Sequence, residues 1–195
     1  MATTINDNLV VNGQLSTVFW TPADNALLGA NDNVAAAGGS TVAISKGTVT
    51  MMKIPIRASG TMTNLWFGLG ASGVGSSTGT FVGVYSSTGV LLSGSADVGT
   101  LFTAAAPSIV TAPLATAQPV SAGTFVWAAL LSNLGTTQPS LFRLGSTGSV
   151  TLLNLGLTAS GLRFCTNGTG TVLGTQLTVT SNTPTSAFTF WVGYS

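Results

Sequence analysis

Residues 81–92 have the sequence FVGVYSSTGVLL, which carries the clearest structural signal in the chain. Two apolar runs rich in β-branched and aromatic side chains flank Ser86-Ser87-Thr88-Gly89, and this tetrad is typical of a tight turn. Gly89 has no Cβ and can adopt the positive φ that such turns often require. The stretch therefore predicts an antiparallel β-hairpin.

Short runs of the same type continue along the 195-residue chain, separated by clusters of Gly, Ser, Thr and Asn. Helix signals are nearly absent, because the chain has no Glu and few Lys residues. This alternation favours an all-β fold, a jelly-roll-like antiparallel β-sandwich. We expect strands at Thr48–Ile56, Thr61–Phe67, Thr80–Ser86, Val90–Ser93, Ser108–Thr111, Thr124–Leu131, Ser140–Leu144, Val150–Leu155, Leu162–Cys165, Thr175–Thr180 and Ala187–Tyr194.

Several of these strands are apolar on both faces, among them Thr124–Leu131 and the final strand. In Thr124–Leu131 the alternate residues on either side are apolar, so the strand should be central in its sheet. Its second face needs a cover, for which a neighbouring subunit is a candidate. We expect core or interface positions at Phe81, Val84, Trp127, Leu130, Phe188 and Phe190.

The first 45 residues differ in composition from the rest. The turn signal Asn12-Gly13 interrupts a short alternating segment, and residues 23–45 are rich in Ala, Asn and Gly. We interpret residues 1–22 as an extended N-terminal docking arm, 23–45 as a linker and 46–195 as the β-sandwich domain. The arm has too little patterned hydrophobicity to bury a core alone, so its apolar side chains should contact a partner. These side chains are Leu9, Val11, Leu15, Phe19 and Trp20.

Charged residues make up 5% of the chain, against roughly 25% in a typical soluble protein. The net charge of +1 and the scattered Lys and Arg residues argue against binding to nucleic acid or to an anionic membrane surface. Apolar runs such as Phe125–Leu131 are far shorter than the roughly 18 residues of a membrane span. Met1–Asp7 lacks the pattern of a secretion signal, so we expect synthesis in a cytoplasm. A mean hydropathy of +0.53 with so few charges predicts a surface that self-associates or joins a larger particle.

Catalytic motifs are scarce. The absence of His excludes Ser-His-Asp and Cys-His arrangements, and zinc has neither His nor paired Cys to bind it. Two carboxylates can hydrolyse a glycoside, but the nearest pair, Asp24 and Asp32, has no aromatic groove residues beside it. The pattern Gly68-x-Gly70-x-x-Gly73 lacks the following helix that a dinucleotide site needs. We therefore expect no enzymatic activity, no catalytic residue and no cofactor.

Two kinds of ligand are compatible with the residue types present. Calcium can use side-chain oxygens from one loop, although the spacing matches no EF-hand and such triplets usually form Asx turns. The candidate ligands are Asp24, Asn25, Asn31, Asp32 and Asn33. Tryptophans can stack on sugars, but Trp66, Trp127 and Trp191 lie in expected strands, where a core or interface role is usual. We predict no metal site and leave calcium open, and we expect Cys165 to be a small buried hydrophobe.

The stretch Thr4–Leu15 and the Thr-Pro segment Phe19–Pro22 resemble the opening of many fibre and head-decoration proteins of tailed bacteriophages. Residues 64–70 and 82–92 are similar to β domains of minor tail and virion proteins of actinobacterial phages. The resemblance covers about half of the chain and carries no catalytic motif.

This resemblance implies a homotrimeric appendage on the virion surface, whose arm docks on the major capsid protein or another virion protein. The lack of a long shaft favours a capsid-decoration or head-fibre protein. The alternative is a tail-associated appendage that binds a receptor or a host-surface glycan. An exposed aromatic groove would favour the alternative, and a flat distal surface covered by Ser and Thr would favour decoration.

Overall fold

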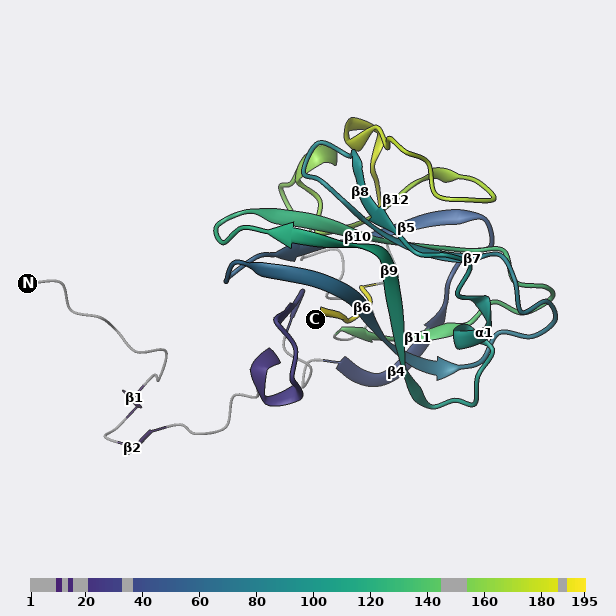
Figure 1. Cartoon of the computed structure of the whole chain (residues 1–195), viewed down its shortest axis with the longest axis horizontal. Coiled ribbons are helices and arrows are strands. Elements are labelled where there is room, and N and C mark those ends of the chain that lie inside the picture. The colour runs from purple at the N-terminus through teal and green to yellow at the C-terminus, as the bar shows by residue number, and fades with distance from the viewer. Residues whose placement is uncertain (1–9, 12–13, 16–20, 33–36, 145–153, 186–188) are drawn as a thin grey trace, which may run out of the picture.

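The computed structural model describes residues 10–11, 14–15, 21–32, 37–144, 154–185 and 189–195. Two six-stranded antiparallel sheets pack face to face (Figure 1), which confirms the predicted all-β sandwich. None of the helices in this part of the chain is long and apolar enough to cross a membrane.

The first sheet has the order β13-β12-β5-β10-β7-β8. Its strands are β5 (Thr48–Pro55), β7 (Thr80–Tyr85), β8 (Leu91–Gly94), β10 (Phe125–Ser132), β12 (Phe164–Thr169) and β13 (Thr183–Pro184). β7 and β8 form the predicted hairpin, in which Gly89 has a φ of 87° and the Ser86 hydroxyl accepts hydrogen bonds from the amides of Thr88 and Val90. The hairpin stands at one edge of the sheet, and β10 lies centrally between β5 and β7.

The second sheet has the order β3-β14-β6-β11-β4, and β9 pairs with the other side of β6. Its strands are β3 (Gly29–Ala30), β4 (Ala37–Ala43), β6 (Gly60–Ala71), β9 (Ser108–Val120), β11 (Ser140–Leu144) and β14 (Val192–Tyr194). The edge strand β9 contains Pro113 and Pro119, which have no backbone N–H to offer to a further strand. This composition suits an edge that stays unpaired.

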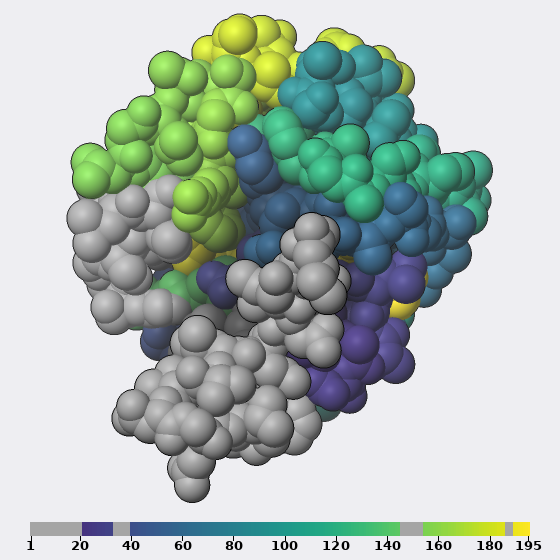
Figure 2. Space-filling model, turned by 90° about the vertical axis from the view of Figure 1, so that its left-hand side faces the viewer, coloured from purple at the N-terminus to yellow at the C-terminus, as the bar shows by residue number. Residues whose placement is uncertain are grey.

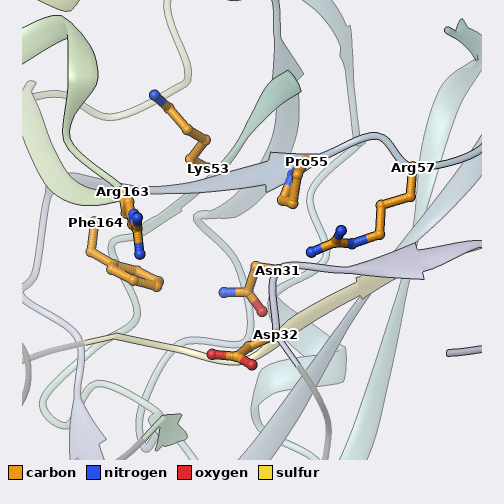
Figure 3. Close-up of a pocket in the computed structure, with 7 residues that line it drawn as sticks. All are labelled: Asn31, Asp32, Lys53, Pro55, Arg57, Arg163 and Phe164. Atoms are coloured by element: carbon orange, nitrogen blue, oxygen red, sulfur yellow. The ribbon is translucent and has the colours of Figure 1, made fainter. Parts of the chain in front are cut away.

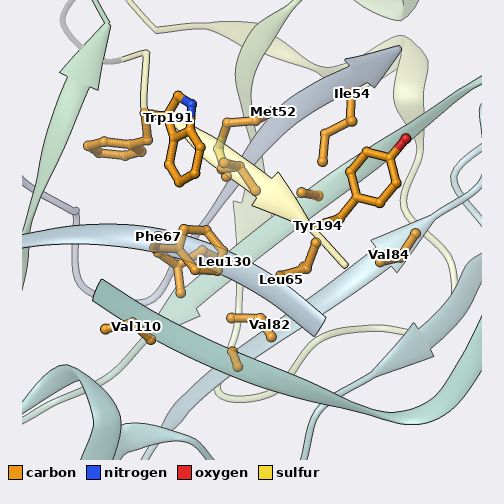
Figure 4. Packing of buried hydrophobic residues seen from close by; sticks show 14 of the residues in the cluster. Met52, Ile54, Leu65, Phe67, Val82, Val84, Val110, Leu130, Trp191 and Tyr194 are labelled. Carbon is orange, nitrogen blue, oxygen red and sulfur yellow. The ribbon is translucent and has the colours of Figure 1, made fainter. Parts of the chain in front are cut away.

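The main core lies between the two sheets (Figure 4). Val126, Ala128 and Leu130 point into it from β10, where they meet residues such as Phe67 of β6. The predicted core positions Val84, Trp127, Leu130 and Phe190 are buried, Phe81 is half-buried, and Phe188 lies outside the described residues.

The outer face of β10 is also buried, and the chain itself covers it. Trp127, Ala129 and Leu131 pack there beneath Leu162 and Leu177. These two leucines belong to a cover segment, residues 154–163 and 170–182, which includes the short 3-10 helices η3 (Ala159–Gly161) and η4 (Val179–Ser181). A neighbouring subunit is therefore not needed to explain why β10 is apolar on both faces.

Backbone hydrogen bonds hold the cover segment on the sheet. The amide of Leu177 donates to the Gly89 carbonyl (2.8 Å), and the amide of Leu91 donates to the Thr175 carbonyl (2.9 Å). The Tyr85 hydroxyl donates to the Gly174 carbonyl (2.7 Å). Residues 175–180, predicted as a strand, make one isolated bridge at Gln176 and then turn into η4, so that prediction was wrong.

Several other boundaries differ from the sequence-based expectation. The composition of residues 23–45 indicated a linker, whereas β3 and β4 within it belong to the second sheet. Small residues conceal these strands, because they give no apolar alternation: Gly29 leaves room for the Tyr194 ring beside it. The predicted strand Ser108–Thr111 extends to Val120, and a single helical turn, α1 (Gly99–Phe102), was not expected. Residues 150–153 lie outside the described residues, and 154–155 form a turn.

The N-terminal part begins with β1 (Val10–Val11), which pairs with β2 (Gln14–Leu15) as an antiparallel hairpin. The turn signal Asn12-Gly13 lies between the two strands, as its sequence predicts. This hairpin belongs to neither of the larger sheets. The next described element is the 3-10 helix η1 (Pro22–Asn25), which precedes β3.

We expect Gly89→Ala to destabilise the protein by at least about 2 kcal/mol, because the added Cβ would strike the Leu177 carbonyl and displace the cover segment. Gly123→Ala is the matched control: its φ of 80° is also positive, but nothing lies within 4 Å of the new Cβ, and it should cost about 1 kcal/mol. Urea unfolding of the two variants measures the difference. Equal losses would show that the cover segment does not rest on the hairpin.

Burial beneath the cover segment raises the pKa of Cys165 to about 12 from its ordinary 9.0. The folded chain keeps the thiol proton at a pH where the unfolded chain has lost it. The difference in proton binding makes the free energy of unfolding depend on pH. The stability is fully present below about pH 9, and it falls by up to about 1.4 kcal/mol per pH unit as the pH rises toward about 12. In unfolding titrations above about pH 9, Cys165→Ala should lose stability less steeply than the wild type. Parallel profiles would mean that the thiol is accessible to solvent.

Candidate functional site

Two adjoining cavities form a cleft at one end of the sandwich, with volumes of about 330 Å³ and about 660 Å³. We call them together the end cleft. The smaller cavity is lined by Asn31, Asp32, Lys53, Pro55, Arg57, Arg163 and Phe164 (Figure 3). The larger shares four of these residues and adds Thr21–Ala23, Leu27–Ala30 and Tyr194. Figure 2 views this end of the molecule directly, with the purple residues of the η1–β3 region beside the blue residues of β5 and β6.

The wall formed by residues 29–32 is fixed to β14. The Asn31 amide donates to the Phe190 carbonyl (2.7 Å) and accepts from the Val192 amide (3.0 Å), so both polar atoms of this side chain are engaged. The Trp191 indole N–H donates to the Asp32 carbonyl (3.1 Å). These side chains hold one wall of the end cleft in place without an ion pair between them.

Pairing between distant strands brings the basic residues of the end cleft together. Arg57 follows the end of β5, and Arg163 directly precedes β12, which pairs with β5. The amide of Lys53 donates to the Arg163 carbonyl (2.8 Å), which sets these two residues side by side. In Figure 3 the Arg57 guanidinium group extends toward Asn31, and the Arg163 side chain lies beside Phe164.

The Lys53 ammonium group points away from the other lining residues. It donates to the Gly161 carbonyl (3.1 Å) and lies 4.1 Å from the centroid of the Phe125 ring and 5.0 Å from that of Trp127. Burial lowers the pKa of this ammonium group, and the neighbouring Arg163 charge also lowers it. Lys53 thus stabilises the outer face of the sheet, while its stem forms part of the end cleft.

The acidic residues do not assemble into the site considered from the sequence. Asp24 accepts hydrogen bonds from the Thr21 amide (2.6 Å) and hydroxyl (2.8 Å), which lower its pKa. It caps η1 and does not line the end cleft, so among the described residues no second carboxylate lies beside Asp32 for glycoside hydrolysis.

Two of the side chains considered as calcium ligands are engaged in hydrogen bonds within the protein. The Asn31 side-chain oxygen accepts from Val192, and Asp24 caps its own helix. In the part of the chain that the structure describes, no three acidic, Cys or His side chains converge. Asn33 lies outside that part. Asp24 thus caps η1 and Asn31 clamps β14, and the Asn31 bonds are long-range contacts, not a local Asx turn.

The docking residues predicted from the sequence remain a prediction. Leu9, Phe19 and Trp20 lie outside the described residues. Val11 and Leu15 are in β1 and β2, and the side chains of this hairpin are not described.

The remaining motifs have structural roles. Gly68 and Gly70 lie in β6, where the absence of side chains accommodates Phe142 and Thr41 of neighbouring strands. Trp127 and Trp191 are buried, and the half-buried Trp66 donates its indole N–H to the Ser195 hydroxyl (2.9 Å). Sequence analysis missed the basic cleft, because Arg163 joins Arg57 only through the β12–β5 register.

No protein-family model matches this sequence, and comparison with curated proteins finds no significant match.

We expect Asn31→Ala to lower the free energy of unfolding by about 2 kcal/mol, because it leaves the Val192 amide and the Phe190 carbonyl without their partner. Asn25→Ala, at an exposed position of η1, should have almost no effect. Both results should be the same with and without added Ca²⁺ in thermal unfolding. A calcium-dependent stabilisation that both variants abolish would instead identify this loop as a calcium site.

Proposed function

We propose that this chain is a structural component of a bacteriophage virion, a capsid-decoration or head-fibre protein. In this proposal the N-terminal arm, residues 1–22, docks on the major capsid protein or another virion protein, and the β-sandwich projects from the particle. The observation that carries the proposal is the polarity of the sandwich. One end carries η1 and the end cleft, and the other end consists of the loops between strands and the short helix α1 (Figure 1).

The direction of β5 relates the two ends. This strand begins at Thr48, next to Gly47, and ends at Pro55 in the end cleft. Thr21, Pro22 and Ala23 line the larger half of the end cleft, so the arm joins the domain there. An arm that binds a particle from this end leaves the opposite end facing outward.

The opposite end is a tightly connected set of loops. Its loops are Ser45–Gly47, 72–79, 95–107 with α1, 133–138 and 170–171. The Gly170 amide donates to the Gly47 carbonyl (2.8 Å), and the Val74 amide donates to the Thr137 carbonyl (2.9 Å). Lys46 and Asp97 are the charged residues in these loops. The Lys46 ammonium group donates to the Gly135 carbonyl (3.0 Å), and the Asp97 carboxylate accepts from the amides of Thr80 (3.1 Å) and Gly99 (2.9 Å). Apart from the exposed Val74, a surface mostly of Ser, Thr, Gly and Asn suits the outward end of a decoration protein.

A receptor- or glycan-binding appendage on the tail is the alternative. Sugar-binding surfaces usually present exposed aromatic rings. Among the described residues, the large hydrophobic side chains that are exposed are all aliphatic: Leu28, Val74, Val90, Ile109, Leu155, Leu157 and Val172. This supports the decoration role over the glycan-binding one.

The proposal includes a homotrimer, which rests on the resemblance to phage appendages and on the low charge of the chain. The apolar outer face of β10 no longer contributes to that argument, because the cover segment buries it. Light scattering of the intact chain should give three times the subunit mass of 19.5 kDa. A monomer at all concentrations would remove the trimer from the proposal.

Deletion of residues 1–20 tests the docking role. The shortened chain keeps Thr21 and the capped η1 helix, so it should fold with an unchanged melting temperature, yet it should no longer co-sediment with virions. Val74→Ser, at the opposite end, is the control and should attach at full occupancy. Full occupancy of the deletion variant would contradict docking through the arm, and absence of the intact chain from purified virions would contradict the virion assignment.

A further inference from the structure

The five basic residues of the chain fall into two groups. Three donate hydrogen bonds to the protein itself: Lys46 to the Gly135 carbonyl (3.0 Å), Lys53 to the Gly161 carbonyl (3.1 Å) and Arg143 to the Ser40 hydroxyl (2.6 Å). The guanidinium groups of Arg57 and Arg163 donate to no residue in the described part of the chain, and both side chains are exposed. These two groups are the ones that extend into the end cleft.

The charge balance in the end cleft is positive. Arg57, Arg163 and the stem of Lys53 line its smaller cavity, and Asp32 is the one carboxylate among the lining residues. The other acidic residue of this segment, Asp24, is turned toward Thr21. A chain with a net charge of +1 thus places two of its five cationic groups, the guanidinium groups of Arg57 and Arg163, at one cavity. Local positive potential of this kind favours an anionic partner group.

Guanidinium chemistry narrows the kind of anion. Each guanidinium presents a planar fork of N–H donors that matches a carboxylate or phosphate in a bidentate manner. A nucleic acid is disfavoured, because two guanidinium groups beside Asp32 cannot neutralise a run of phosphates. A sugar acid is disfavoured, because the one aromatic ring of the smaller cavity, Phe164, is only 5% exposed and offers little stacking surface.

We propose that the end cleft is a docking socket for an acidic loop of the protein on which this chain sits, with Arg57 and Arg163 each binding a carboxylate of that loop. The identity of the partner rests on the proposed virion function. The chemistry of the contact rests on the residues that line the end cleft. The arm joins the domain at the same cleft, so a partner bound by the arm lies within reach of both guanidinium groups. The apolar side chains of the arm supply most of the affinity, and the paired charges set orientation and association rate.

The chemistry can be tested without the virion. A hexaglutamate peptide should shift the amide NMR signals of residues 31–32, 53–54, 56–57 and 163–164, and a hexaglutamine peptide should not. Arg57→Gln with Arg163→Gln should weaken hexaglutamate binding by about fivefold or more. The charge-matched control, Lys46→Gln with Arg143→Gln, removes two cations away from the end cleft and should bind as the wild type does.

A second double variant separates geometry from charge. Arg57→Lys with Arg163→Lys keeps both charges but loses the planar forks, so its affinity should fall between those of the wild type and the Gln variant. Both positions are exposed, and thermal unfolding verifies that each variant is folded. Equal binding by the Gln variant and the wild type would overturn the proposal. Tighter binding of polygalacturonate than of hexaglutamate would assign the end cleft to an acidic sugar and overturn the protein partner.

The virion experiment distinguishes this inference from the proposed function. If the Arg57→Gln, Arg163→Gln variant attaches to particles more slowly and loses the salt dependence of attachment, both proposals are supported. If it attaches exactly as fast as the wild type while deletion of residues 1–20 abolishes attachment, the docking arm stands and the socket is refuted. If neither change affects attachment, the docking end itself is wrong.

Discussion

The structure depends on one constraint: β10 is apolar on both faces and must be covered on both. The second sheet covers the face that carries Val126, and the cover segment buries the face that carries Trp127. The Trp127 indole N–H has no hydrogen-bond partner among the described residues, which costs about 1–3 kcal/mol. Burying an indole of about 200 Å² at roughly 25 cal/mol per Å² contributes about 5 kcal/mol. This gain exceeds the cost of the unpaired N–H, so burial of Trp127 is favourable overall. The cover segment therefore counts as a third layer of the core.

In this protein, asparagine side-chain amides make tertiary contacts that charged side chains make in many other proteins. Asn154 donates to the Phe164 carbonyl and accepts from the Arg163 amide, both at 2.8 Å, and so ties the cover segment to β12. Asn167 donates to the Thr178 carbonyl and to the Asn182 side chain (2.9 and 2.6 Å), and Asn31 clamps β14 in the same way. Amides do not titrate and are little screened by salt. A scaffold held by such contacts keeps its stability across the neutral pH range and over a wide range of ionic strength.

The sequence predicted the parts of the fold that are strongly patterned. The alternating residues of 125–131 and the turn at Ser86–Gly89 specified the central strand and the hairpin, because period-two burial and turn chemistry are local. β3 and β4 were missed, because their small residues show no alternation of apolar and polar side chains. Their positions are set by contacts with Tyr194 and with β11. The end cleft could not be predicted, because Arg57 and Arg163 are far apart in the sequence. They come together only when β12 pairs with β5.

The two ends of the sandwich differ in how their polar groups are used, and this difference bears on function. At the loop end, backbone groups and Lys46 bond to one another, which leaves little capacity for a partner. At the cleft end, Arg57 and Arg163 keep their donors free of described protein groups, beside the segment where the arm begins. Exposed guanidinium groups are satisfied by water, so their arrangement adds nothing to folding and has no structural explanation in the domain. The docking surface that we propose, with apolar anchoring through the arm and charge-guided orientation at the end cleft, would account for both features.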